Sequence, residues 1–191
     1  MAKILILDNY DSFTYNLVHY VKDFEKHDVD VFRNDQISLN DVDKYDGIIL
    51  SPGPGLPAEA GLLLKIIENY YESKRIFGVC LGQQAIAEVF SGSLINLSKV
   101  HHGVATQVEL VQPQHYIFEG LPSQIEVGRY HSWVVNPANF PRCLKVTARD
   151  ASGEIMALEH KEFDVCGVQF HPESILTPQG KEIVFNWLKR F

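Results

Sequence analysis

The chain has 191 residues, with 17 Lys and Arg against 24 Asp and Glu, and its formal net charge is −7. This length suits one domain spanning residues 1–191, and the acidic balance argues against a nucleic-acid partner, because nucleic acid is bound chiefly through Lys and Arg. No apolar run reaches the roughly 18 residues of a membrane span, and the N-terminus lacks a signal-peptide pattern, so we expect a cytoplasmic protein without membrane contact.

Strand and helix patterns alternate through the first half of the chain. Short apolar runs predict strands at 3–8, 47–52 and 75–80, the first two of them buried, and an alternating run predicts a strand at 28–33. Apolar residues at helical spacing predict helices at 14–24, 60–72 and 81–90. This alternation predicts an α/β fold with a mostly parallel central sheet and helices on both faces.

The second half has a different texture. Short strand-like runs separated by turns occur at 94–97, 106–111, 124–130, 132–135, 144–149, 155–160 and 165–170, followed by a helical pattern at 180–191. Runs of this kind predict antiparallel additions to the sheet or to one of its edges.

Cys80 lies between Gly78 and Gly82, where a predicted strand meets a predicted helix. A sharp turn there would display the thiol at a helix N-terminus, where the dipole favours the thiolate. A buried core cysteine packed by glycines is the alternative, and the motif alone leaves both open. The three cysteines are widely spaced and form neither a disulfide framework nor a metal pattern, so we predict no metal site.

A nucleophilic thiol needs a base, and the run VQFHPES offers one. His171 and Glu173 are two residues apart on an extended segment, so they share a face, as in a carboxylate-oriented imidazole. A surface histidine beside an unrelated glutamate is the alternative. The loop SPGPG (51–55) follows another buried strand and could aim backbone N–H groups at a ligand oxygen, although a plain turn is the simpler interpretation.

Together these segments resemble the class I (triad) glutamine amidotransferases. SPGPG, GVCLGQQ and VQFHPES are similar to the three signature segments of that family, in the same order. DNYDSFTYNL (8–17) and GRYHSWVV (128–135) resemble a narrower branch, the glutaminase subunits of anthranilate synthase and of aminodeoxychorismate synthase.

The resemblance implies roles for individual residues. It makes Cys80 the nucleophile, His171 the general base and acid, and Glu173 the residue that orients His171. The N–H groups of Leu81 and Gly53 would form the oxyanion hole. The implied glutamine-binding residues are Gly53, Pro54, Gly55, Gln84, Ser132 and Trp133. Gln83 and Trp133 depart from the usual histidine and leucine of the branch.

The resemblance also implies a partner. The chain has no segment left to bind chorismate, so ammonia would pass to a separate chorismate-aminating synthase subunit that uses Mg²⁺, with no cofactor in this chain. Plausible interface residues are Asn9, Ser12, Phe13 and Asn16, although a capping and turn cluster explains them equally well.

Two further alternatives remain open from the sequence. Either pathway, anthranilate or aminodeoxychorismate, or both, fits these motifs, and we favour anthranilate synthase. From a different class of protein, a flavodoxin-type binding module could use the hydroxyls and amides of DNYDSFTYN for a phosphate.

Overall fold

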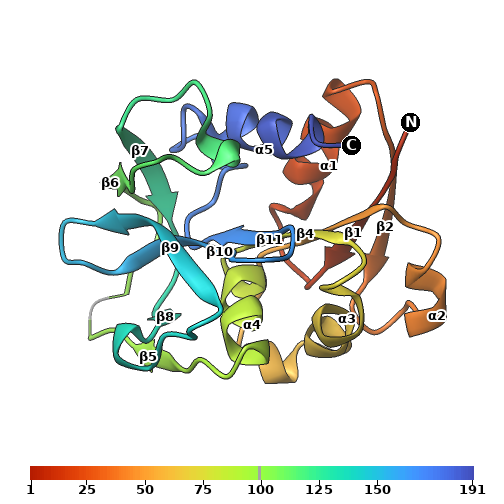
Figure 1. Ribbon diagram of the computed structural model, residues 1–191, viewed down its shortest axis with the longest axis horizontal. Helices are drawn as coiled ribbons and strands as arrows, with labels where there is room; N and C mark the ends of the chain where they lie inside the picture. Colours follow the sequence, from red (N-terminus) through yellow and green to blue (C-terminus); the bar gives the residue numbers. More distant parts are fainter. Residues whose placement is uncertain (99) are drawn as a thin grey trace.

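A computed structural model describes residues 1–98 and 100–191. Within these residues nine strands form one sheet in the order β2-β1-β3-β4-β11-β10-β9-β6-β7, and β5 pairs with β8 in a small second sheet (Figure 1). The strands from β2 to β11 in this order are parallel, and those from β10 to β7 are antiparallel. The predicted α/β class and the antiparallel additions are both confirmed.

The parallel strands are β1 (Lys3–Asp8), β2 (Asp28–Arg33), β3 (Gly47–Leu50), β4 (Arg75–Val79) and β11 (Val165–Val168). The remaining strands are β5 (Leu94–Asn96), β6 (Val104–Leu110), β7 (Gln124–Arg129), β8 (Trp133–Val135), β9 (Leu144–Asp150) and β10 (Ile155–His160). The helices are α1 (Thr14–Asp23), α2 (Leu39–Val42), α3 (Leu63–Tyr70), α4 (Leu81–Val89) and α5 (Gly180–Leu188).

Strand β1 shows how the core is divided by the sheet. Successive strand residues point to opposite faces, and Ile4 and Ile6 join the cluster packed by α1 and α5, whereas Leu5 and Leu7 join the cluster packed by α3 and α4. Figure 1 shows these two helix pairs on opposite sides of the sheet. The continuous apolar run KILIL is thus typical of a strand buried on both faces.

Two predicted helices have the wrong boundaries, and one short helix was not predicted. The helix expected at 60–72 is α3 and begins only at Leu63, because Gly61, with φ 54°, separates it from a short 3-10 turn at Pro57–Glu59. Helix α2 was not predicted; its N-cap Ser38 accepts a hydrogen bond from the Asp41 N–H at 3.3 Å. The last helix ends at Leu188 and not at Phe191.

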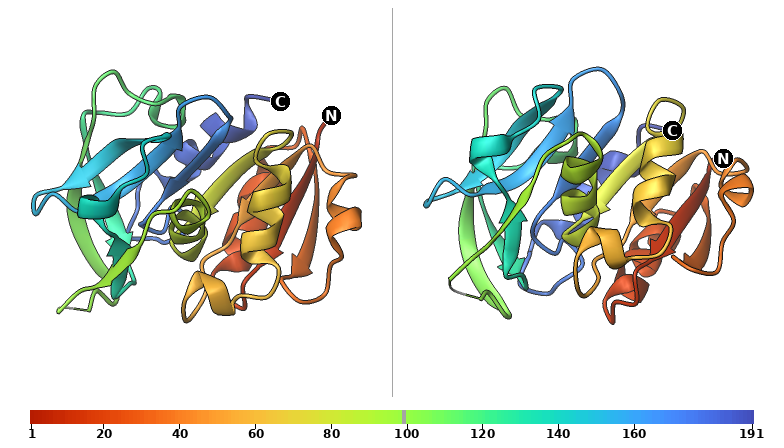
Figure 2. Two further views of the ribbon diagram at one scale, coloured as in Figure 1. Left: turned by 60° about the horizontal axis from the view of Figure 1, so that its bottom comes forward. Right: turned by 90° about the horizontal axis from the view of Figure 1, so that it is seen from below.

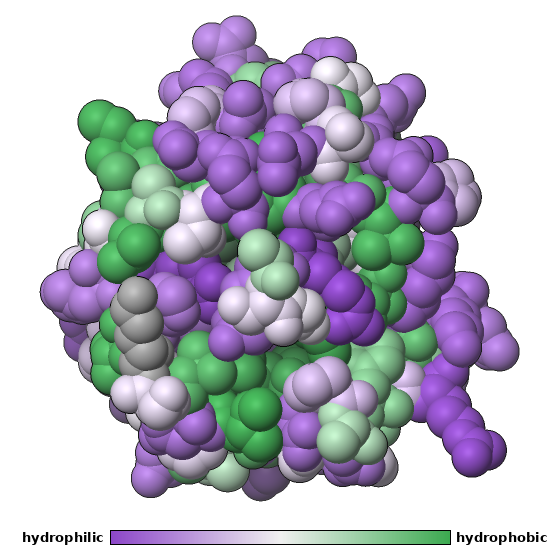
Figure 3. Space-filling view, turned by 90° about the vertical axis from the view of Figure 1, so that its left-hand side faces the viewer, coloured by the Kyte–Doolittle hydropathy of each residue, from purple (hydrophilic) through white to green (hydrophobic). Residues whose placement is uncertain are grey.

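The antiparallel strands extend one side of the molecule away from the parallel layer (Figure 2). Seen from that side, hydrophobic residues form several patches separated by hydrophilic ones (Figure 3). Val104 on β6 and Ile95 on β5 are among the exposed apolar residues of this half, each 38% exposed.

Strands β1, β3, β4 and β11 run in one direction and therefore end at one edge of the sheet. In the register, Leu7 pairs with Leu50, and Val79 pairs with Val168. The loops that follow begin at adjacent points of this carboxyl edge, where α/β folds place their sites.

Candidate active site

Cys80 occupies the turn between β4 and α4. Its backbone dihedrals are φ 51° and ψ −99°, a conformation that costs on the order of 1–3 kcal/mol for a residue with a Cβ. The neighbouring glycines are required by space, because a Cβ on Gly78 would lie 2.5 Å from the Gly82 carbonyl carbon, and one on Gly82 would lie 2.6 Å from the Leu50 oxygen. The turn therefore holds the thiol at the N-terminus of α4, as the glycine spacing predicts.

Backbone N–H groups surround this turn. The first helical bond of α4 runs from the Gln84 N–H to the Cys80 oxygen at 3.1 Å, so the Leu81 N–H has no acceptor within the helix. Gly53 lies against Leu81, since a Cβ on Gly53 would be 2.8 Å from Leu81 Cδ2. The two segments expected to form an oxyanion hole are thus in contact beside Cys80.

His171 and Glu173 follow β11, and both are buried. His171 Nδ1 lies 2.7 Å from Glu173 Oε1, which fixes the tautomer with its proton on Nδ1. Burial opposes protonation of the imidazole, but the thiolate of Cys80 and the carboxylate of Glu173 outweigh it and raise the pKa of His171 well above its usual value. Apart from Cys80, Nε2 has no hydrogen-bond partner among the described residues, so it is the nitrogen that takes up the thiol proton and later returns it.

The loop after β3 is held rigidly at the same edge. The Ser51 hydroxyl donates to the Pro52 oxygen at 2.7 Å and accepts from the Asn9 N–H at 2.8 Å. Gly53 has no room for a side chain, because a Cβ would lie 2.6 Å from the Asn9 oxygen. Gly55 has φ 75°, which glycine adopts without strain.

Cys80 lies between two adjoining pockets. The first has a volume of about 230 Å³ and is lined by Gly53, Pro54, Gly55, Cys80, Gln84, Tyr130, His131, Ser132 and Trp133. The second has a volume of about 400 Å³ and is lined by Tyr10, Asp11, Ser12, Phe13, Pro52, Gly53, Pro54, Cys80, His102, Tyr130 and His171. All six residues that the resemblance assigns to glutamine line the first pocket.

Gln84 is more constrained than the sequence suggests. Its Nε2 atom donates to the Trp133 carbonyl oxygen at 2.8 Å and to Gln169 Oε1 at 3.2 Å. The side-chain nitrogen is therefore committed within the protein. A substrate would meet the remaining Oε1 atom or the pocket wall that Gln84 holds in place.

The predicted interface residues divide into two groups. Asn9 is 2% exposed, its amide donates to the Ser51 oxygen at 2.8 Å, and it accepts from Asn34 at 3.1 Å, so its assignment to an interface is wrong. Ser12 and Asn16 are exposed, and Phe13 is half-buried.

Phe13 and Asn16 both contact the segment that carries the histidine. The ring of Phe13 lies 6.0 Å from that of His171 and 5.4 Å from that of Tyr130. The Asn16 amide donates to the Glu173 carbonyl oxygen at 3.3 Å. Phe13 and Asn16 therefore help to position the segment that carries His171 and Glu173.

Sequence reasoning missed Tyr130, His131 and Gln169. Tyr130 packs its ring 4.9 Å from the His171 ring, and its hydroxyl lies 3.0 Å from the Ser174 hydroxyl. Tyr130 and His131 stand directly before the predicted Ser132, and Gln169 precedes the predicted His171 by two residues. Their positions next to predicted site residues could have identified them as candidates from the sequence.

An ion cluster around the buried Arg129 lies next to His131. Arg129 is 2% exposed and pairs with Asp150 and Glu154, and its Nε donates to His131 Nε2 at 3.1 Å. Burial and the positive charge of Arg129 lower the pKa of His131 to about 3, so this imidazole is neutral near pH 7. His131 therefore lines the pocket as an uncharged ring, and its hydrogen bond from Arg129 holds it in place.

The first loop does not suit a phosphate. Asp8 Oδ1 accepts from the Tyr10 N–H at 2.9 Å and from the Thr14 hydroxyl at 2.9 Å, and Asp11 accepts from the Phe13 N–H at 2.8 Å. Carboxylates already occupy the donors that a phosphate would need and would repel it. The flavodoxin-type alternative is therefore not supported by this loop.

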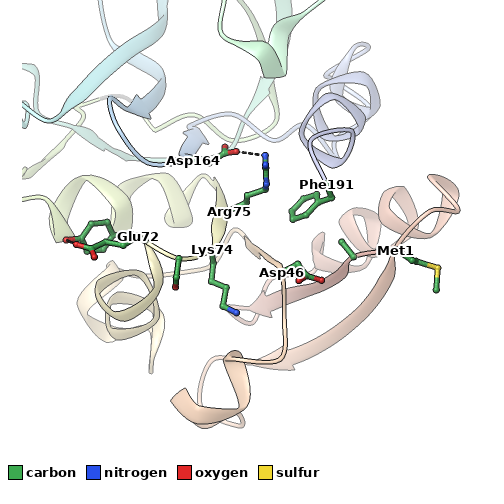
Figure 4. Close-up of a pocket in the computed structure, with 10 residues that line it drawn as sticks. Met1, Asp46, Glu72, Lys74, Arg75, Asp164 and Phe191 are labelled. Atoms are coloured by element: carbon green, nitrogen blue, oxygen red, sulfur yellow. Dashed lines mark hydrogen bonds and ion pairs between the residues drawn. The ribbon is translucent and has the colours of Figure 1, made fainter.

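A larger cavity, of about 540 Å³, lies at the opposite edge of the sheet (Figure 4). Its two cationic side chains already have partners, because Arg75 binds Asp164 and Lys74 donates to the carbonyl oxygens of Asp43 and Tyr45. Its lining contains neither a cysteine nor a histidine.

Within residues 1–98 and 100–191, no group of three or more His, Cys, Asp or Glu side chains is arranged to hold a metal ion. In the same part of the chain, no helix combines the length and the hydropathy that crossing a membrane requires.

The model of the class-I glutamine amidotransferases matches residues 5–191, so the chain belongs to this family of α/β enzymes. A protein of Thermoplasma acidophilum, a candidate GMP synthase component, has the same fold, with a TM-score of 0.88 and 29% identity over 99% of this chain and 93% of that one.

Two curated relatives are similar over nearly their whole length. The aminodeoxychorismate/anthranilate synthase component 2 of Bacillus subtilis is 44% identical over 98% of this chain and 96% of its own. The aminodeoxychorismate synthase component 2 of Escherichia coli is 45% identical over 98% and 100%. The bifunctional protein TrpGD of Thermotoga maritima is 40% identical over 98% of this chain, which spans only 32% of that longer protein.

Proposed function

We propose that this chain is the glutaminase subunit of a chorismate-aminating synthase and that Cys80, His171 and Glu173 are its catalytic triad. The observation that carries the proposal is the Cys80 thiol at the wall of a pocket, with the hydrogen-bonded His171–Glu173 pair behind it. The names of the curated relatives support a synthase that makes anthranilate or aminodeoxychorismate.

The chemistry follows from these positions. Cys80 Sγ attacks the side-chain carbonyl carbon of glutamine while its proton passes to His171 Nε2. The negative charge develops on the carbonyl oxygen, where the N–H groups of Leu81 and Gly53 would stabilise it. His171 then returns the proton to the departing nitrogen, which leaves as ammonia. A γ-glutamyl thioester remains on Cys80, and water hydrolyses it to glutamate.

The pocket of about 230 Å³ would hold the substrate. Gly53, Pro54 and Gly55 form one wall, and Ser132 and Trp133 form another. Gln84 ties the second wall to the helix that begins at Cys80. Glutamine is thus bound between segments that also position the nucleophile.

At the face around the second pocket, ammonia would pass to the synthase subunit. Ser12, Phe13 and Asn16 are interface candidates there, and Ile175, two residues after Glu173, is 94% exposed. A shielded route would keep ammonia from becoming ammonium in bulk water.

We propose that this chain needs no cofactor, because cysteine, histidine and glutamate together supply nucleophile, base and orienting group, and that Mg²⁺ is bound by the partner. All three cysteines are free thiols, which supports a reducing, cytoplasmic setting. Anthranilate synthase is the first candidate. Aminodeoxychorismate synthase is the second, because both names occur among the relatives.

The test uses Cys80→Ser in complex with the synthase subunit, with chorismate as acceptor. We expect glutamine-dependent amination to be lost, while amination with added ammonium salt is retained. Chromatographic identification of the product separates anthranilate from aminodeoxychorismate. Glutamine-dependent amination at the wild-type rate would refute the proposal.

A further inference from the structure

Gln169 is a buried polar residue that the triad chemistry leaves unused. It follows β11 directly, its exposed fraction is 0%, and its side-chain Nε2 lies 3.5 Å from Cys80 Sγ. Sulfur is a large acceptor, so this separation is within the range of an N–H···S hydrogen bond. The sulfur therefore has a second polar neighbour in addition to His171.

The orientation of the Gln169 amide follows from its surroundings. The Trp133 carbonyl oxygen can only accept, so the Gln84 atom 2.8 Å from it must be the nitrogen. The same nitrogen lies 3.2 Å from the Gln169 amide, and the atom facing it must be the acceptor Oε1. The other end of the amide, which faces Cys80 Sγ, is then the donor Nε2.

We propose that Gln169 is a catalytic residue that donates a hydrogen bond to the Cys80 sulfur and stabilises its thiolate, and that Gln84 holds this donor in orientation from the Trp133 wall of the pocket. The proposal rests on the proposed function, because it concerns the same nucleophile. The thiol proton goes to His171, and no covalent bond forms in this step.

A hydrogen bond to an ionised group is about twice as strong as one between neutral groups. The Gln169 donor therefore favours the thiolate over the thiol. Hydrogen bonds join the Trp133 carbonyl to Gln84, Gln84 to Gln169, and Gln169 to the Cys80 sulfur. The pocket wall that would contact glutamine is thus connected to the sulfur.

Gln83 provides a matched control at the start of α4. It is 0% exposed, and among the described residues neither of its amide atoms has a hydrogen-bond partner. Gln83 and Gln169 are thus equally buried amides close to Cys80, but only Gln169 bonds to the sulfur. Replacing either by methionine removes an amide of similar size.

The test measures the rate at which iodoacetamide alkylates Cys80 between pH 5 and pH 10, with the Cys80 peptide quantified by mass spectrometry. For Gln169→Met we expect the pH midpoint to rise by about one unit and the rate near pH 7 to fall about tenfold. Gln169→Glu should raise the midpoint further, since its carboxylate would face the thiolate. Gln83→Met should retain the wild-type profile.

Gln84→Met is a second variant that keeps Gln169 in place but frees its amide to turn. We expect a smaller change, with the rate near pH 7 about threefold lower. Folding of each variant is checked by circular dichroism and by a cooperative urea transition.

A wild-type alkylation profile in folded Gln169→Met would overturn the inference. If that variant does not fold, a wild-type profile for Gln84→Met would do so. Neither assay requires glutamine turnover or the synthase partner. Failure of this inference is therefore distinguishable from failure of the proposed function, which would show as amination surviving in Cys80→Ser.

Discussion

The two edges of the parallel sheet each carry a cavity, and the larger one lies where no reactive groups meet. At the amino edge, the cavity of about 540 Å³ is lined by neither a cysteine nor a histidine, and its Arg75 and Asp164 side chains are paired with each other. At the carboxyl edge, the strained Cys80 lines both the pocket of about 230 Å³ and the adjoining pocket that contains the base, His171. Backbone strain and the presence of a nucleophile and a base therefore identify the candidate active site better than the volume of a cavity does.

The same contrast applies to two of the cysteines. Cys166 lies within β11, and burial together with nearby Asp164 raises the pKa of its thiol well above the usual value. Cys80 is the same residue type and is similarly buried, but it stands at a turn, lines two pockets and has a base within reach. Position at the strand end, and not burial, separates the two.

The largest expected effect comes from removing the carboxylate of the proposed triad. Glu173→Gln leaves His171 without the charge that stabilises its protonated form, so we expect glutamine hydrolysis to fall by about 10²–10⁴-fold. Steady-state release of glutamate by the complex measures this. Glu72→Gln, at the amino-edge cavity, is the matched control and should keep wild-type rates. A similar loss of glutamine hydrolysis in both variants would contradict the assignment of the active site to the carboxyl edge.

A smaller effect is expected from His131 as the pH is lowered. Its pKa is about 3 in the folded chain and about 6.5 when unfolded, so the unfolded chain binds the proton first. The stability that this difference contributes is present above pH 6.5 and is lost as the pH falls toward 3. Between pH 7 and pH 4.5 the wild type should lose about 2–3 kcal/mol more than His131→Gln.

Urea unfolding at the two pH values measures that difference. Because the loss is compared between two pH values within each protein, the constant cost of losing the Arg129–His131 hydrogen bond in His131→Gln cancels. Equal losses for wild type and His131→Gln would show that the imidazole is not held neutral by its surroundings.

The smallest effect is expected at the amino edge. Arg75→Met breaks the ion pair with Asp164, whose carboxylate still accepts from the Tyr116 hydroxyl at 2.7 Å. Both partners of the pair are about one-third exposed. We expect a loss of about 1 kcal/mol in stability and unchanged glutamine hydrolysis. A substantial loss of glutamine hydrolysis would contradict the conclusion that the amino edge takes no part in the reaction.

Local patterns were sufficient to predict much of this molecule. The alternation of apolar runs predicted the parallel layer, and the glycines around Cys80 predicted a sharp turn whose positive φ the structure shows. The carboxyl edge then brings Cys80, His171 and Glu173 together, because parallel strands end on one side of a sheet.

Other features depend on contacts between distant segments and could not be predicted in this way. Asn9 looked available for a partner, but Ser51 and Asn34 bury it. The bond between Gln84 and Gln169 requires two side chains 85 positions apart to meet at one point. The Arg129 cluster similarly depends on how β7 faces the β9–β10 turn.

The most direct measurement of the central claim is covalent trapping with a glutamine analogue that carries a diazoketone in place of its amide. After incubation with the complex and proteolysis, mass spectrometry should place the adduct on the Cys80 peptide alone, and excess glutamine should protect it. An adduct on Cys143 or Cys166 instead, or none on an actively turning-over complex, would contradict the assignment of Cys80 as the nucleophile.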